Sequence, residues 1–127
     1  MVNKTLEHLD CAADVELPQI AAPSLSAAVR ALRTQLLATI RTHDAQLVVV
    51  QGDTSSAYAG ALAAVEAGVP LAHLEAGLRS GHPYRPFPEE LFRRRIARLA
   101  SLHLAPTTAA AAVARRRPAS APGTAAA

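Results

Sequence analysis

The fold is decided by residues 47–74, which read LVVVQGDTSSAYAGALAAVEAGVPLAHL. The apolar run at 47–50 is short, β-branched and without polar alternation, which is typical of a strand buried on both faces of a parallel sheet. The alanine-rich stretch 55–67 ends at Gly68, a residue that favours a left-handed helix end. A second apolar run follows at 69–74. The stretch therefore predicts one β-α-β unit with parallel strands and a right-handed helical crossover.

An amphipathic helix is predicted before this unit, from residue 24 to His43-Asp44. Ser24 or Ser26 can cap its amino end. Its apolar residues recur at three- and four-residue steps, which is the helical period. They are Leu25, Val29, Leu32, Leu36 and Ile40.

The chain after the β-α-β unit is predicted to continue the α/β pattern. Residues 77–88 hold two Gly and three Pro, which indicates an irregular loop long enough to carry function. The loop is predicted to be followed by a helix from Glu89 to about Leu102 and by a strand at 102–105. A last helix is predicted to be capped by Thr107 and to end near Arg117. We expect an α/β fold with a Rossmann-like parallel sheet and flanking helices.

The length of 127 residues fits one domain. Composition divides the chain into an irregular lead-in at 1–23, a partial Rossmann-like domain at 24–117 and a low-complexity tail at 118–127, which we expect to be disordered. All ten acidic residues lie at or before Glu90, whereas seven of the 13 basic residues lie after it. The net charge of +3 therefore describes mainly the carboxyl-terminal part.

Several classes of function are disfavoured by composition. One lysine and few aromatic residues argue against a nucleic-acid partner. Cys11 is the sole cysteine, so an intramolecular disulfide and a cysteine-based metal site are excluded. No apolar run approaches the ~18 residues of a membrane-spanning helix, and the amino terminus lacks the apolar core of a signal peptide. We expect a cytoplasmic protein without membrane insertion.

Two carboxylates follow the two predicted strands. Asp53 comes three residues after Val50, and Glu75 directly follows Leu74. Because ligands bind beyond the carboxyl ends of parallel strands, both acids belong to one candidate site. Gly52 permits a tight turn there, and the Thr54 hydroxyl with the helix-terminal N–H groups suits a phosphate or sugar oxygen.

Each of these residues also has a structural interpretation. Asp53 could cap the crossover helix, and Glu75 could form an ion pair with Arg79. Glu89 and Glu90 could simply favour the positive end of a helix dipole.

The remaining polar residues carry weaker signals. His73 is expected to be a buried histidine with satisfied hydrogen bonds, and a His73/Glu75 metal pair lacks a third ligand of suitable spacing. The run 93–95 of three arginines is expected to be solvated, with one member turned inward. The sequence contains no dinucleotide fingerprint, P-loop or nucleophile elbow.

Three motifs occur in order along the chain: VVQGDTSSAYAGALAA at 49–64, PLAHLEAGLRS at 70–80 and PFPEELFRR at 86–94. This set resembles the non-hydrolysing UDP-N-acetylglucosamine 2-epimerases of bacteria. Hydrolysing epimerases share the G-D and H-x-E-A-G elements and stay an alternative.

The resemblance implies part of the amino-terminal domain of a two-domain glycosyltransferase-B-like fold, with a UDP-sugar in the cleft between the halves. It implies epimerisation of UDP-N-acetylglucosamine at C2 without a cofactor, a role in cell envelope polysaccharide biosynthesis, and allows a homo-oligomer. Asp53, Glu75 and Glu89 match the catalytic carboxylates. Gly52, Thr54 and Arg79 match substrate-binding positions.

The chain also departs from the family pattern. Phe92 stands where the family generally has Asn, and Ala97 where it has Asp. The family's first strand has no counterpart before Met1, and its second domain has none after Thr107. We therefore expect no turnover by this chain alone. The alternative is a non-catalytic module that pairs with a separately encoded second half.

Overall fold

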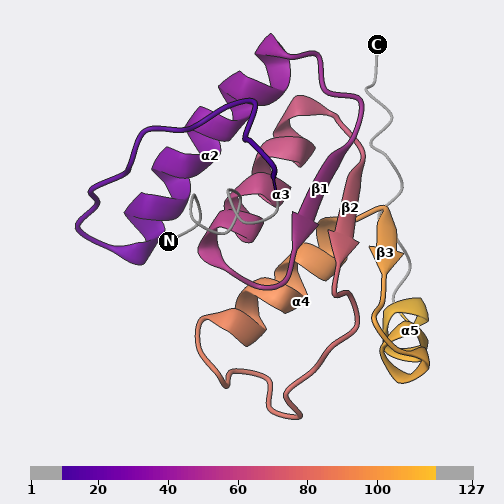
Figure 1. Ribbon diagram of the computed structural model, residues 1–127. Coiled ribbons are helices and arrows are strands. Elements are labelled where there is room, and N and C mark those ends of the chain that lie inside the picture. The colour runs from indigo at the N-terminus through magenta and orange to yellow at the C-terminus, as the bar shows by residue number, and fades with distance from the viewer. Residues whose placement is uncertain (1–9, 117–127) are drawn as a thin grey trace, which may run out of the picture.

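The computed structural model describes residues 10–116 and shows a three-stranded parallel sheet with helices packed against it (Figure 1). The strands are β1 (Val48–Gln51), β2 (Leu71–Leu74) and β3 (Leu102–Leu104), in the order β1-β2-β3. The predicted α/β class is confirmed. The expected disordered tail lies outside the described residues. None of the described helices has the length and apolar character that crossing a membrane requires.

Helix α2 (Leu25–Thr42) has the predicted bounds and the predicted cap. The Ser24 hydroxyl accepts a hydrogen bond from the backbone N–H of Ala27 at 3.2 Å, which satisfies one orphan donor of the first turn. Val29 and Ile40 from the apolar stripe are buried. Helix α2 packs on α3, and so forms an outer layer over the crossover helix.

Helix α3 (Ser55–Ala67) is the predicted crossover, and Gly68 ends it in the left-handed conformation at φ +72°. Its buried residues are alanines and one glycine. Small side chains let the helix approach the sheet closely: a Cβ added at Gly60 would lie 3.1 Å from Cγ1 of Val50. The alanine content thus serves close helix-to-sheet packing.

The prediction that β1 is buried on both faces is wrong. Val50 is 7% exposed, whereas its neighbour Val49 is 52% exposed. Successive residues of a strand point to opposite faces, and α3 and α4 (Glu89–Leu99) pack against the face that carries Val50 and Leu71. The buried core therefore lies on one side of the sheet.

Helix α4 ends at Leu99, three residues before the predicted end near Leu102. Ala100 is already extended, at ψ 137°. The side chain of Ser101 donates to the Leu71 carbonyl at 3.1 Å and accepts from the Leu71 N–H at 3.3 Å, so the chain joins the sheet early. Helix α5 (Thr108–Arg115) follows β3 and begins at the predicted cap Thr107.

Gly77 and Gly81 provide a matched test of packing between the loop after β2 and α5. Both have φ +83°, but an added Cβ at Gly77 would lie 1.9 Å from the Ala110 carbonyl oxygen, and one at Gly81 would meet nothing within 4 Å. Gly81→Ala is expected to lower the free energy of unfolding by about 1–2 kcal/mol, the cost of the left-handed backbone. Gly77→Ala should lower it by about 3 kcal/mol or more, because the steric clash adds to that cost.

Urea denaturation of both variants measures the difference. Equal losses of stability would show that α5 does not pack on Gly77 in solution.

Candidate active site

The site lies where β1 and β2 end at the same edge of the sheet. The Gly52 N–H donates to the Leu74 carbonyl at 3.2 Å, so the parallel pairing continues beyond the strands. The buried His73 donates from Nε2 to the Gly52 carbonyl at 2.8 Å. Gly52 has φ +71°, and its turn carries the chain from β1 to Asp53.

Glu75 lies at this edge in a left-handed conformation, with φ +63°. Its Oε1 accepts a hydrogen bond from Nε2 of Gln51 at 2.7 Å. A Cβ added at Gly52 would lie 3.5 Å from the other oxygen of Glu75, so the carboxylate sits over the glycine turn. Gln51 is a partner that the sequence did not suggest.

Asp53 is not the cap of the crossover helix. Thr54 is, because its hydroxyl accepts from the Ala57 N–H at 3.2 Å. The Asp53 carboxylate instead contacts the guanidinium of Arg93, which comes from α4. Asp53 is therefore held by an ion pair across the site, and the Thr54 hydroxyl already has a structural role.

Glu90 holds the other side of Arg93. Its carboxylate is completely buried and binds two guanidiniums, Nη1 of Arg93 at 2.6 Å and Nε of Arg94 at 2.8 Å. The prediction that one arginine of the triplet turns inward is confirmed, since only 15% of the Arg93 side chain is exposed. A chain of alternating charges, Asp53–Arg93–Glu90–Arg94, thus links the sheet edge to α4.

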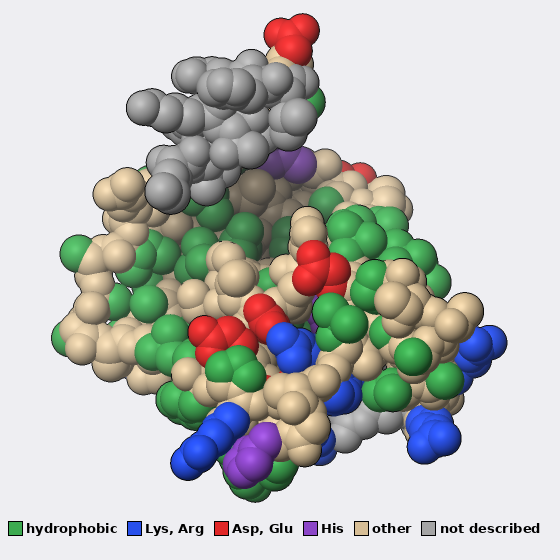
Figure 2. Space-filling model, turned by 60° about the horizontal axis from the view of Figure 1, so that its bottom comes forward, with side chains coloured by type: hydrophobic (Ala, Val, Ile, Leu, Met, Phe, Trp, Pro, Cys, Tyr) green, Lys and Arg blue, Asp and Glu red, His purple; other side chains and the backbone are tan. Residues whose placement is uncertain are grey.

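A hollow of about 320 Å³ opens beside this chain of charges. Figure 2 shows acidic and basic side chains gathered on this side of the molecule. Three of the predicted site residues line the hollow together; its lining is Leu25, Asp53, Thr54, Ser55, Pro88, Glu89 and Phe92. Glu75 and Arg79 lie outside that lining. The structure thus places Asp53 and Glu89 in the lining of one hollow, whereas Glu75 lies outside it, against Gln51 and the Gly52 turn.

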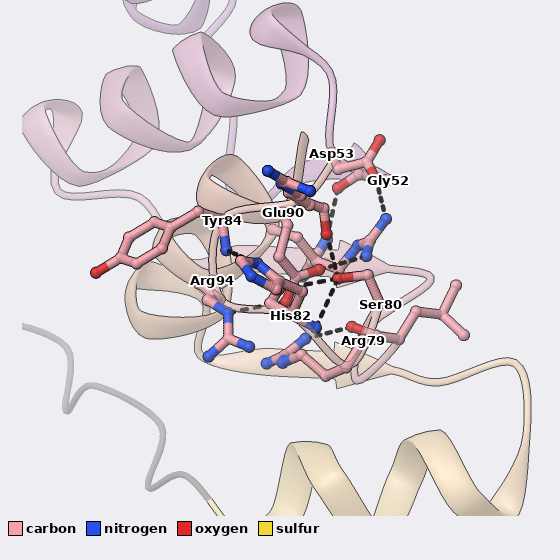
Figure 3. A network of polar contacts seen from close by, with 12 residues as sticks. Gly52, Asp53, Arg79, Ser80, His82, Tyr84, Glu90 and Arg94 are labelled. Atoms are coloured by element: carbon pink, nitrogen blue, oxygen red, sulfur yellow. Dashed lines mark hydrogen bonds and ion pairs between the residues drawn. The ribbon is translucent and has the colours of Figure 1, made fainter. Parts of the chain in front are cut away.

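Arg79 lies on the loop after β2, where its Nη1 donates to the Leu78 carbonyl at 2.5 Å. The loop folds around Ser80, whose hydroxyl donates to the His82 carbonyl at 3.0 Å and also contacts the Arg85 carbonyl (Figure 3). This hydrogen bonding gives the Gly- and Pro-rich loop a defined shape beside the site.

The departures from the family pattern are accommodated by packing. Phe92 is 5% exposed and stacks on Tyr58, with ring centroids 4.9 Å apart. The guanidinium carbon of Arg95 lies over the ring of Tyr58, 5.7 Å from its centroid. Ala97 is buried as well. The two apolar residues therefore bury surface in α4 where polar groups would need hydrogen-bonding partners.

Sequence reasoning missed Glu90 and Arg93 as parts of one ion-pair chain. The only signal was the spacing of three and four residues from Glu90 to Arg93 and Arg94, which allows helical ion pairs. Within residues 10–116, no three His, Cys, Asp or Glu side chains group closely enough to hold a metal ion.

Two histidines lie side by side on the neighbouring strands, His73 on β2 and His103 on β3. Burial lowers the pKa of both imidazoles. The charge of Arg79 lowers the pKa of both further, and the hydrogen bond to Gly52 opposes this shift for His73. Both side chains are therefore favoured in the neutral form when the chain is folded.

This shift makes folding stability depend on pH. The unfolded chain binds protons at the ordinary histidine pKa of 6.5, whereas the folded chain binds them only at lower pH. The free energy of unfolding should be constant above that value and fall below it, by up to about 1.4 kcal/mol per pH unit for each histidine. Urea denaturation at pH 7.5 and 5.5 should show a smaller loss of unfolding free energy in His73→Gln than in the unsubstituted chain. A profile unaffected by His73→Gln would contradict this.

Glu90 and Glu66 compare a buried with an exposed ion pair. Glu90→Gln leaves two guanidiniums without their shared buried carboxylate and should cost about 3 kcal/mol or more of the free energy of unfolding. Glu66 pairs with Arg33 at 2.6 Å, but both side chains are about 40% exposed, so Glu66→Gln should cost less than about 1 kcal/mol. Thermal unfolding followed by circular dichroism measures both. Similar costs for the two variants would show that Glu90 is not a structural anchor.

The fold and site together define a Rossmann-like α/β domain with a cluster of carboxylates at the carboxyl edge of its parallel strands. The family model described as UDP-N-acetylglucosamine 2-epimerase matches residues 1–117. The chain therefore belongs to the UDP-N-acetylglucosamine 2-epimerase family.

Relatives and solved structures agree with this assignment. The chain is 51% identical over 61 residues to the UDP-N-acetylglucosamine 2-epimerase of Bacillus subtilis, a match that covers 48% of this chain and 16% of the relative. It is 35% identical over 109 residues to the UDP-N-acetylglucosamine 2-epimerase of Neisseria meningitidis, covering 84% of this chain and 29% of the relative.

The fold is shared with solved epimerase structures. The Neisseria meningitidis enzyme bound to UDP-GlcNAc superposes with a TM-score of 0.85 at 32% identity, over 91% of this chain and 31% of that chain. S. aureus MnaA in complex with UDP superposes with a TM-score of 0.83 at 38% identity, over 90% of this chain and 30% of that chain. The expectation of a partial glycosyltransferase-B-like domain is thus confirmed, and the chain spans less than a third of these relatives.

Proposed function

We propose that this chain provides the carboxylate-bearing edge of a UDP-N-acetylglucosamine 2-epimerase of the non-hydrolysing type, with Asp53, Glu75 and Glu89 as its catalytic residues. The observation that carries the proposal is the hollow lined jointly by Asp53, Thr54 and Glu89. The relatives with UDP or UDP-GlcNAc bound support a nucleotide sugar as the substrate.

The proposed reaction inverts C2 by elimination and re-addition. A carboxylate removes the proton from C2, the electron pair forms the C1–C2 double bond, and the C1–O bond breaks so that UDP leaves with its electrons. UDP then adds back to C1 while a carboxylic acid delivers a proton to the opposite face of C2. The product is UDP-N-acetylmannosamine, a precursor for cell envelope polysaccharides. No step of this reaction requires a cofactor.

The chemistry asks for several positioned carboxylates. Abstraction and return of a carbon-bound proton need a base and an acid on opposite faces of the sugar. Positive charge that develops at C1 as the diphosphate leaves is stabilised by a nearby carboxylate. The ion pair with Arg93 orients the Asp53 carboxylate at the hollow, and the hydrogen bond from Gln51 orients that of Glu75. Gly52, Thr54 and Arg79 contribute to substrate binding.

The isolated chain is proposed to have no turnover. It spans less than a third of the relatives that it matches, and the rest of the substrate surface belongs to the part that it does not span. A cytoplasmic location fits a chain with a single cysteine. We also propose that the complete enzyme forms a homo-oligomer.

A chimeric enzyme tests the assignment of catalytic residues. Residues of this chain replace the matched 109-residue stretch of the Neisseria meningitidis relative, and product formation from UDP-N-acetylglucosamine is followed by NMR. Asp53→Asn, Glu75→Gln and Glu89→Gln should each lower kcat by about 100-fold or more, the usual contribution of a general acid or base. Glu66→Gln, on the exposed side of α3, is the matched control and should leave kcat unchanged.

Variants at all three positions that keep kcat within a few-fold of the unsubstituted chimera would refute the assignment. Release of free N-acetylmannosamine together with UDP would instead identify the hydrolysing reaction.

A further inference from the structure

Both backbone polar groups of Gly52 are held by β2. The Gly52 N–H donates to the Leu74 carbonyl at 3.2 Å, and the Gly52 carbonyl accepts from Nε2 of His73 at 2.8 Å. That carbonyl and the N–H of Asp53 belong to one planar peptide group. The hydrogen bond from His73 therefore sets the orientation of the peptide that leads directly into Asp53.

The same turn lies against Glu75. A Cβ added at Gly52 would lie 3.5 Å from Oε2 of Glu75, which is ordinary van der Waals contact, so the carboxylate rests on the Gly52 backbone. A shift of this turn would therefore move the start of Asp53 and also the surface beneath the Glu75 carboxylate. One backbone position thus controls the placement of two carboxylates that leave different strands.

His73 supplies one fixed N–H to this turn. Its side chain is completely buried, and burial lowers the pKa of the imidazole, which the hydrogen bond to Gly52 opposes. The neighbouring His103 and the charges of Arg79 and Arg93 lower that pKa further. A neutral imidazole carries a single N–H, and a carbonyl oxygen can only accept, so the proton lies on Nε2. Nδ1 is buried and has no hydrogen-bonding partner among the described residues.

His103 shows that a buried imidazole at this place does not by itself hold the turn. It is the residue of β3 that pairs with His73 in the sheet register. Both of its ring nitrogens are buried, and neither has a hydrogen-bonding partner within residues 10–116. Replacement of His73 by an apolar residue would instead leave the Gly52 carbonyl without the donor that satisfies it. The two histidines are neighbours, but only His73 contacts the backbone of the site.

We propose that His73 is a positioning residue of the active site, which acts through its single hydrogen bond to the Gly52 carbonyl. Its side chain does not line the hollow beside Asp53 and Glu89, so it acts on the carboxylates through the backbone and not on the substrate. The effect on catalysis rests on the proposed function, because it requires the catalytic roles of Asp53 and Glu75. The effect on the geometry of the turn does not depend on those roles.

Nuclear magnetic resonance of the 127-residue chain tests the geometry without any activity. Long-range nitrogen–proton correlation in the unsubstituted chain should show the His73 proton on Nε2. The amide nitrogen of glutamine can take the place of Nε2, whereas that of the shorter asparagine cannot reach it. His73→Gln should therefore leave the backbone amide shifts of Asp53 and Glu75 nearly unchanged, and His73→Asn should move both. His103→Asn is the matched control and should leave both shifts close to their original values.

Kinetics of the chimeric enzyme test the consequence for catalysis. His73→Asn should lower kcat by about tenfold or more, because small displacements of a catalytic group are costly, and should change KM less than about threefold, because the imidazole does not contact the hollow. His73→Gln should restore kcat to within about threefold of the unsubstituted chimera, and His103→Asn should leave it unchanged. A histidine that only fills the core would not give this difference between two amide side chains.

A proton on Nδ1, equal amide shifts in the two His73 variants, or equal kcat values for them would each overturn the proposal. The position of the proton is measured in the unsubstituted chain and His73→Gln keeps the donor, so a His73→Asn variant that fails to fold does not remove the test. A chimera without turnover before any substitution would count against the proposed function. The proton position and the amide shifts of Asp53 and Glu75 would then decide the role of His73 by themselves.

Discussion

The parallel pairing of β1 with β2 is the constraint on which the site depends. The pairing runs from Val48 with Leu71 to Gln51 with Leu74 and is extended by the backbone hydrogen bond from Gly52 to Leu74. The buried His73 closes the same turn from the side of β2. Two segments that are 22 residues apart in sequence therefore deliver Asp53 and Glu75 to a common edge. An antiparallel pair would have placed the two acids at opposite ends of the sheet.

Helix α4 completes the site by electrostatics. Its first turn brings Glu89 to the hollow, while the next residue, Glu90, is buried and anchors two guanidiniums. Arg93 lies between two carboxylates and so joins the helix to the sheet edge. The same ion pair restricts the orientation of the Asp53 carboxylate. A buried ion pair by itself adds little net stability, but removing one partner is costly because it leaves an uncompensated buried charge.

Sequence patterns predicted the elements well and their surroundings less well. The helical period of residues 25–42 and the turn residues Gly68 and Thr107 located helix ends correctly, because these signals are local. The cap of α3 could not be decided from sequence, because Asp53 and Thr54 are both good caps. In the structure Thr54 caps the helix, and Asp53 pairs with Arg93 of α4. Resemblance to a family supplied Glu89, whose role no local pattern could distinguish from a favourable helix-dipole charge.

Burial could not be predicted where it depends on what covers a surface. Val49 belongs to an apolar run that is typical of a strand buried on both faces. It is nevertheless exposed, because no described helix covers its face of the sheet. Glu90 looks like an exposed first-turn acid, yet it is buried because Arg93 and Arg94 neutralise it. The exposure of Val49 depends on what packs over β1, which no short sequence period encodes. The ion pairs of Glu90 lie within α4, and their three- and four-residue spacing is visible in the sequence, but the burial of the carboxylate is not.

A crystal structure of the chimeric enzyme with bound UDP-N-acetylglucosamine would show whether the substrate occupies this edge of the sheet. We expect the sugar ring to lie in the hollow beside Asp53 and Glu89, with a carboxylate oxygen about 3 Å from the atoms that exchange the proton or carry the charge. The assignment of the catalytic carboxylates would be contradicted if the sugar were bound elsewhere, with Asp53 in contact only with Arg93 and no carboxylate of this edge near C1 or C2.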